Sequence, residues 1–146
     1  MIRLEVPFKD KNLSVTWDCD ENLIKYQKMQ RESFLSKVPS SLFESKFNEL
    51  YLNLWLDISK FGLYEGLPNN PKILDVGSGS AVMDLLAYSY LEKSNFYLLD
   101  KEEMSYTGIY FSPNEAHGFY HSWGPIADAI QTSKFNHSDF TFLEPD

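Results

Sequence analysis

The chain has 146 residues, of which 43% are hydrophobic and 16% aromatic, so it holds enough apolar material for the core of one domain. Its formal net charge of −8, without a stripe of lysines or arginines, disfavours a large nucleic-acid surface. No signal-peptide pattern opens the chain, no apolar stretch approaches the ~18 residues of a membrane span, and the single cysteine cannot form an internal disulfide. We therefore expect a cytoplasmic protein that acts on a small molecule, without a membrane or nucleic-acid partner.

The first 66 residues predict a hairpin followed by two helices. Apolar and polar residues alternate over residues 2–8 and 13–17, which is typical of paired β-strands. The hairpin either packs on the core or serves as a lid or dimerisation arm. A first helix is expected from a cap at Asp20 to about Lys37, where Pro39 ends it.

The second predicted helix starts at a capping box formed by Ser41 and Glu44 and ends near Gly62. Six apolar residues recur at helical spacing and predict its buried face: Phe43, Phe47, Leu50, Leu54, Ile58 and Phe61. We treat residues 1–66 as a hairpin and helical cap, and residues 67–146 as a second segment of the same compact unit.

Residues 72–81, K-I-L-D-V-G-S-G-S-A, predict a buried strand, a glycine turn and the start of a helix. Glycines adopt backbone angles closed to other residues and let a ligand approach the chain closely. The amides that open the following helix favour a negative group, whereas Asp75 would repel a diphosphate and favour a cation. A second apolar run ends at Asp100, the position at which α/β sheets bind a ribose diol.

This combination resembles motifs I and II of the class I, Rossmann-like S-adenosylmethionine-dependent methyltransferases. Asp75, Gly77, Gly79 and Asp100 match the motif position by position, while Ala81 replaces its third glycine. The resemblance implies that S-adenosyl-L-methionine is the cofactor, with the first acid and the glycine turn on its methionine part and Asp100 on its ribose. The cofactor-binding set that it implies is Asp75, Gly77, Ser78, Gly79, Asp100, Lys101 and Asp146, where Asp146, or else Glu144, would read the adenine.

A long aromatic segment separates Asp100 from the next helix, which Pro125 opens. It either forms an active-site flap or packs on the sheet. His117 and His121 within it are candidate general bases or simply surface histidines. They have no third ligand nearby, so no metal site is expected.

The expected fold is thus α/β, with a Rossmann-like partial parallel sheet preceded by the hairpin and two helices. Only three strands of the family's seven are visible, the third at residues 139–143, so a partner chain, a second copy or further sequence is expected to cover the sheet. The expected function is methyl transfer to a small-molecule hydroxyl or amine, possibly of a sugar. The alternatives are a non-catalytic S-adenosylmethionine-binding module and a nucleotide- or NAD-binding protein, although Val82 stands where a dinucleotide motif needs its last glycine.

Overall fold

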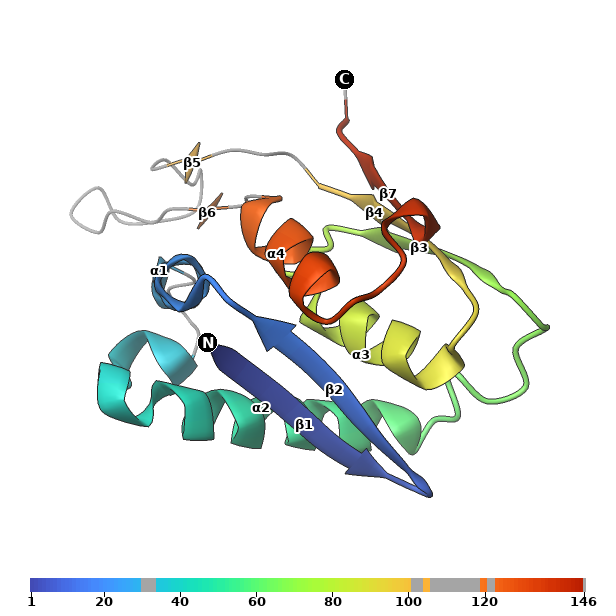
Figure 1. Ribbon diagram of the computed structural model, residues 1–146, viewed down its shortest axis with the longest axis horizontal. Coiled ribbons are helices and arrows are strands. Elements are labelled where there is room, and N and C mark those ends of the chain that lie inside the picture. The colour runs from blue at the N-terminus through green and yellow to red at the C-terminus, as the bar shows by residue number, and fades with distance from the viewer. Residues whose placement is uncertain (30–33, 101–103, 106–118, 121–122, 146) are drawn as a thin grey trace.

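The computed structural model describes residues 1–29, 34–100, 104–105, 119–120 and 123–145 of an α/β protein. An antiparallel hairpin and two helices precede a three-stranded parallel sheet, as the sequence predicts. Helices α3 (Val82–Leu91) and α4 (Gly124–Thr132) lie between the hairpin and the sheet (Figure 1).

The hairpin consists of β1 (Ile2–Phe8) and β2 (Lys11–Trp17), which pair antiparallel with Leu4 opposite Val15. The inward-facing apolar residues of both strands are buried, so the hairpin packs on the core. The outer edges of the two strands are held by side chains from the helices. The side chain of Asn48 on α2 (Phe43–Ser59) bonds to β1, and the hydroxyls of Ser89 and Ser133 accept hydrogen bonds from the backbone of β2.

Helix α1 (Asp20–Met29) is shorter than the sequence predicts, and short 3₁₀ helices follow at Phe34–Lys37 and Ser40–Leu42. The predicted capping box is wrong. Because Ser41 lies inside a 3₁₀ turn, Leu42 becomes the N-cap of α2 and makes no side-chain capping bond. The carboxylate of Glu44 instead accepts a hydrogen bond of 3.1 Å from the backbone N–H of Arg3.

The predicted buried face of α2 is correct only in its first two turns. The residues that are buried are Phe43, Phe47, Tyr51 and Trp55, each four positions after the last. Leu54 is exposed, and Phe61 is 87% exposed because the helix ends at Ser59. The larger aromatic rings of Tyr51 and Trp55 therefore occupy the core positions that the sequence pattern gave to leucines.

The parallel sheet contains β3 (Lys72–Val76), β4 (Asn95–Leu99) and β7 (Phe140–Leu143), in the order β3-β4-β7. A 3₁₀ turn at His137–Asp139 leads into β7. Met104–Ser105 and Phe119–Tyr120 form a separate two-stranded pair, β5 and β6, and β6 lies beside α1.

One face of the sheet is covered by α3, whose Tyr88 contacts the rings of Phe96 on β4 and Phe140 on β7. On the other face, Leu74 and Val76 of β3 are 60% and 70% exposed. Among the described strands, β3 is also an edge of the sheet. An apolar face and an open edge thus occur together, as expected for a sheet of three strands.

Candidate functional site

The glycine turn between β3 and α3 adopts backbone angles that explain its composition. Gly77 and Gly79 have φ angles of 78° and 54°, in the left-handed region that favours glycine. Ala81 has a φ of 50° and is the N-cap of α3. A left-handed alanine costs about 1 to 2 kcal/mol, so this turn holds a strained backbone at the start of the helix.

Backbone hydrogen bonds fix the turn to the tip of the neighbouring strand. The N–H groups of Gly77 and Ser78 donate to the carbonyl oxygen of Leu99, at 2.7 and 3.3 Å. Leu99 is also the register partner of Val76, the last residue of β3. The turn therefore sits across the carboxyl ends of both strands, which is where ligands bind in open α/β sheets.

Asp100 directly follows β4 and contacts the glycine turn from that side. Its Oδ2 atom accepts a hydrogen bond of 2.8 Å from the backbone N–H of Gly79. Asp75 lies on the first strand, one residue before its end. The structure thus places Asp75, Gly77, Ser78, Gly79 and Asp100 at the carboxyl ends of two adjacent strands. Asp75 lies on β3, Asp100 directly follows β4, and both aspartates are half-buried.

A third carboxyl group, which the sequence analysis did not single out, belongs to the same site. Asp84, in the first turn of α3, is only 6% exposed. Burial and, after it, the neighbouring carboxyl group of Asp75 raise the pKa of Asp84 to about 8. The sequence signal that could have identified Asp84 is its position among Val82, Leu85 and Leu86, which form the buried face of the helix.

The helices of the N-terminal segment pack against the turn and supply polar side chains that the sequence analysis also missed. The Oη atom of the buried Tyr26 on α1 would lie 3.4 Å from a Cβ atom placed on Gly79, so a larger side chain there would crowd it. Gln27 donates hydrogen bonds to Tyr51 Oη at 3.2 Å and to Ser80 Oγ at 3.1 Å. This network fastens α1 and α2 to the turn. Sequence periodicity could not reveal it, because the network depends on how distant segments meet.

Ser78, between the two glycines, has a buried hydroxyl with no hydrogen-bond partner in the described structure. Helix α3 begins immediately after the turn without a side-chain cap. An uncapped helix start offers N–H groups to a carboxylate, while Asp75 favours a cation. The chemistry of the turn therefore suits a zwitterionic group, and Asp100 offers an acceptor for hydroxyls at the next strand.

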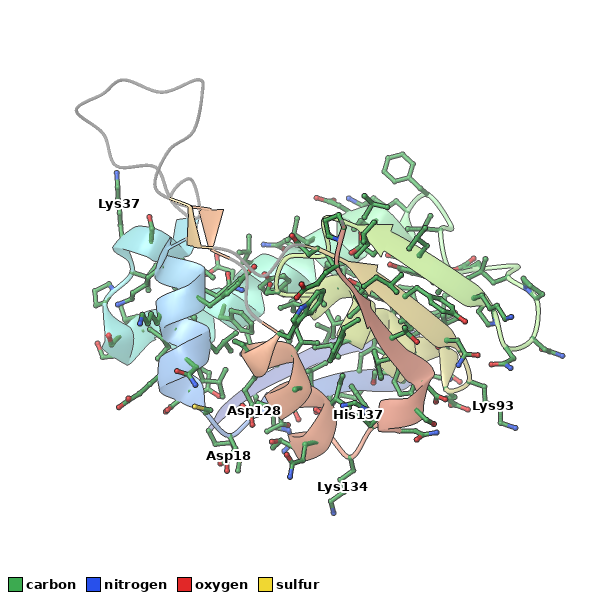
Figure 2. The ribbon with its side chains drawn as sticks, turned by 90° about the horizontal axis from the view of Figure 1, so that it is seen from above. Asp18, Lys37, Lys93, Asp128, Lys134 and His137 are labelled. Carbon is green, nitrogen blue, oxygen red and sulfur yellow. The ribbon has the colours of Figure 1, made fainter. Side chains whose placement is uncertain are left out.

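Four predicted site residues, namely Lys101, His117, His121 and Asp146, lie outside the described residues, as does most of the aromatic segment. Glu144, the second candidate for adenine, accepts a hydrogen bond of 3.1 Å from Trp123 Nε1. His137 is the remaining histidine of the chain and precedes β7 (Figure 2). It therefore lies at the amino ends of the parallel strands, across the sheet from the glycine turn.

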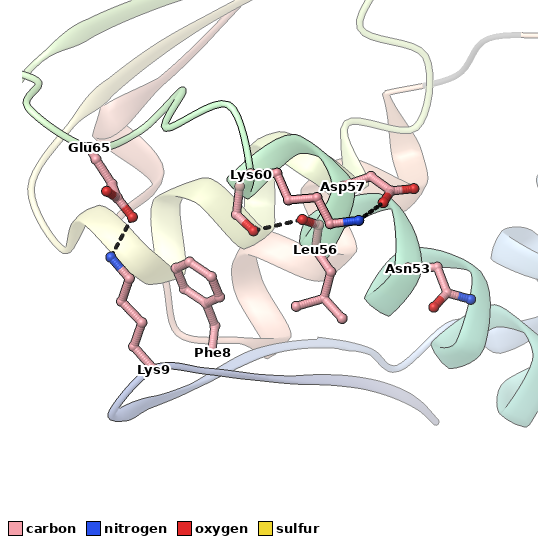
Figure 3. A pocket seen from close by; sticks show the side chains of 8 residues that line it. Phe8, Lys9, Asn53, Leu56, Asp57, Lys60 and Glu65 are labelled. Carbon is pink, nitrogen blue, oxygen red and sulfur yellow. Dashed lines mark hydrogen bonds and ion pairs between the residues drawn. The ribbon is translucent and has the colours of Figure 1, made fainter.

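A separate hollow of about 490 Å³ lies at the other end of α2, near the turn of the hairpin (Figure 3). It is lined by Phe8, Leu56 and the ion pairs Lys9–Glu65 and Lys60–Asp57. Both lysines are thus held by carboxylates, and no residue of the glycine turn reaches this hollow. Within the described residues no cluster of three or more His, Cys, Asp or Glu could hold a metal ion, and none of the described helices is long and apolar enough to cross a membrane.

Comparisons with protein-family models, with curated proteins and with solved structures find no match to this chain.

Proposed function

We propose that the glycine turn binds S-adenosyl-L-methionine and that the chain is part of a methyltransferase acting on a small-molecule hydroxyl or amine. The observation that supports this best is that Asp75 and Asp100 lie at the carboxyl ends of adjacent parallel strands. The hydrogen bond from Gly79 to Asp100 links the two positions through the turn itself. A nucleoside with a charged amino-acid tail needs one set of binding groups for its ribose and another for its tail. Asp100 and the glycine turn with Asp75 could supply these two sets next to each other.

The proposed roles follow from the chemistry of each side chain. Asp100 would accept hydrogen bonds from the ribose hydroxyls, because a carboxylate can accept several at once. Gly77 offers open space, since no described atom beyond its two chain neighbours lies within 4 Å of where its Cβ would be, so a ligand could contact its backbone. Asp75 and Ser78 would face the ammonium group, and the start of α3 would hold the carboxylate.

The proposed reaction is a direct displacement at the sulfonium methyl group. An acceptor oxygen or nitrogen attacks the methyl carbon while its bond to sulfur breaks, and S-adenosylhomocysteine leaves with the electron pair. Such a reaction depends mainly on holding donor and acceptor in line. A base is needed only where the acceptor keeps a proton of high pKa.

Isothermal titration calorimetry with S-adenosylhomocysteine tests the binding. We expect saturable binding to the unmodified protein, and 10- to 100-fold weaker binding by Asp100→Asn, equivalent to a loss of about 1 to 3 kcal/mol. The asparagine can still accept the Gly79 N–H but presents an amide to the ribose. Asp57→Asn, which removes an exposed carboxylate from the far end of α2, is the matched control and should bind normally.

The same titration separates the alternatives. Binding of NAD in place of S-adenosylhomocysteine, or unchanged affinity in Asp100→Asn, would contradict the proposal. A carboxyl pair beside the turn makes a diphosphate unfavourable, so we expect no heat from NAD. Binding without methyl transfer to any acceptor would support a module that binds the cofactor without catalysis.

A further inference from the structure

The glycine turn and the start of α3 are held in place from two sides. On one side, oxygen atoms of Leu99 and Asp100 accept the backbone N–H groups of residues 77–79. On the other side, Ser80 Oγ accepts a hydrogen bond of 3.1 Å from Nε2 of Gln27 on α1. The first half of the turn therefore depends on the tip of β4, and the second half depends on a helix of the N-terminal segment.

Ser80 lies where the backbone most needs a restraint. Its neighbours Gly79 and Ala81 have φ angles of 54° and 50°, and this left-handed conformation is unfavourable for a residue with a Cβ atom such as Ala81. The helix that follows has no side-chain cap to hold its first turn. A hydrogen bond to the side chain of Ser80 thus restrains the backbone at the point where α3 begins.

Gln27 is itself fixed by the core. Its Nε2 atom also donates a hydrogen bond of 3.2 Å to Oη of Tyr51 on α2. The ring of Tyr51 packs against that of Phe47, with the two ring centroids 4.7 Å apart. Gln27 is only 3% exposed, so it offers almost no surface to a ligand and acts on the turn through Ser80.

We propose that Gln27 is a positioning residue that holds the start of α3 for the amino-acid tail of the ligand, and so makes the site selective for nucleosides that carry this tail. The inference rests on the proposed function, in which the start of α3 holds the tail carboxylate and Asp100 holds the ribose. Asp100 contacts the turn through Gly79 and not through Ser80. Loss of the Gln27 bond should therefore disturb the binding of the tail and leave the binding of the ribose in place.

Calorimetry with two ligands tests this selectivity. Gln27→Met keeps the length and the helix propensity of the side chain but has no N–H group to donate. S-adenosylhomocysteine should bind to this variant about 10-fold more weakly, as expected for the loss of one buried hydrogen bond. 5′-Methylthioadenosine has the same nucleoside without the ammonium and carboxylate, and its affinity should change by less than about twofold. A variant that merely loosened the whole domain would weaken both ligands alike.

A double-mutant cycle with Ser80→Ala tests whether Gln27 acts through Ser80. Ser80→Ala removes the acceptor and should weaken S-adenosylhomocysteine as Gln27→Met does, and the double variant should bind no more weakly than either single variant. If Ser80 contacted the ligand itself, its loss would weaken binding further in Gln27→Met. Asn48→Ala is the matched control, because it also removes a helix side-chain amide that bonds to two partners, here on β1, and it should change neither affinity.

Hydrogen exchange without ligand gives a second measure of the positioning. The Ala81 amide donates to the Ser78 carbonyl at 2.8 Å, and the Gly77 amide donates to the Leu99 carbonyl. In Gln27→Met, the Ala81 amide should exchange about 5- to 10-fold faster, because the start of α3 opens more often. The Gly77 amide should exchange as it does in the unmodified protein.

The outcomes distinguish this inference from the function on which it rests. If Gln27→Met binds S-adenosylhomocysteine normally, if both ligands weaken equally, or if the effects of the two substitutions add, the inference is wrong and the proposed function stands. If neither nucleoside binds to the unmodified protein, the proposed function and the selectivity fail together, while exchange of the Ala81 amide still decides whether Gln27 positions the start of α3. Circular dichroism establishes that the variants are folded. Should Gln27→Met not fold, Ser80→Ala alone gives the same comparison of the two ligands.

Discussion

Asp84 is an acidic side chain in the first turn of a buried helix, between residues that form the core. Two effects oppose each other at this position. The start of a helix favours a negative charge by about 0.3 to 1 kcal/mol at the surface, whereas burial beside Asp75 disfavours it. Burial and, after it, the neighbouring carboxyl group of Asp75 raise the pKa of Asp84 to about 8. The side chain is therefore held in its protonated form in the folded state near neutral pH.

The first prediction concerns the stability of the protein as a function of pH. Asp84 has an ordinary pKa of 3.8 when unfolded and about 8 when folded, so between these values the folded state binds more protons. Its stabilising effect is full below about pH 4 and is lost as pH rises towards 8, at a rate on the order of 1 kcal/mol per pH unit. We expect urea unfolding to show a smaller decline in stability for Asp84→Asn than for the unmodified protein over this range.

Above about pH 8, Asp84→Asn should be the more stable of the two proteins, because it avoids a second buried negative charge. Asp57→Asn removes an exposed carboxylate and should follow the unmodified protein throughout. Parallel stability curves for Asp84→Asn and the unmodified protein would contradict the raised pKa of Asp84.

At the level of elements, the hairpin shows how short strands are held without further strands beside them. The edge of a strand presents unpaired N–H and C=O groups that need partners. On β1, Asn48 of α2 accepts a hydrogen bond from Glu5 N–H at 2.9 Å and donates one to the Arg3 carbonyl at 2.9 Å. Helix side chains thus substitute for a neighbouring strand and fix α2 along the hairpin.

The second prediction follows from this bridge. Asn48→Ala removes both hydrogen bonds and should lower the free energy of unfolding by about 1 to 2 kcal/mol, each exposed bond contributing modestly. Asn53 lies on the exposed side of the same helix. Asn53→Ala raises helix propensity by the same amount but breaks no bond to β1, so it should be neutral or slightly stabilising. Urea unfolding of both variants gives the difference. Equal effects would show that the bridge contributes nothing.

The sequence alone predicts those elements whose signals are local. The alternating residues of the hairpin, the glycine turn with its positive φ angles, and Pro125 at the start of α4 were all identified from neighbouring residues. The wrong predictions concern residues whose neighbours are compatible with more than one local structure. Ser41 could have capped a helix but lies in a 3₁₀ turn, and Phe61 continues a helical pattern beyond the point where the helix ends.

The residues of the site also divide into those that the sequence predicts and those that it does not. Asp75, the glycines and Asp100 form a motif whose spacing is readable, and the structure brings them together. Asp84 carries a readable signal too, as an acid among buried residues, but its meaning depends on the distance to Asp75. Tyr26 and Gln27 carry no such signal, because nothing in α1 indicates that it will pack on a turn some fifty residues later. Tertiary contacts of this kind are set by the whole fold.

At the scale of the molecule, the hairpin segment and the sheet segment share one set of buried contacts. Phe8 at the end of β1 contacts the rings of both Trp55 on α2 and Tyr90 on α3. The hydroxyls of Ser89 on α3 and of Ser133, the C-cap of α4, accept hydrogen bonds from the backbone of β2. Residues 1–66 therefore complete the core of residues 67–146, and they also supply the side chains that fasten the glycine turn.

The third prediction is that the two segments unfold together. Tryptophan fluorescence reports mainly on residues 1–66 through Trp17 and Trp55, whereas hydrogen exchange of the β3 and β4 amides reports on the sheet. Because the buried contacts are continuous, both signals should change at one urea concentration, as in two-state unfolding.

Trp55→Ala should shift both transitions equally, with a loss of about 3 to 5 kcal/mol as for other buried aromatic residues. Phe61→Ala is the matched control, because this ring is 87% exposed and its removal should leave both transitions in place. If Trp55→Ala moved the fluorescence transition and left the sheet amides protected, the hairpin segment would be a separate unit, and the turn would keep its shape without the helices that pack on it.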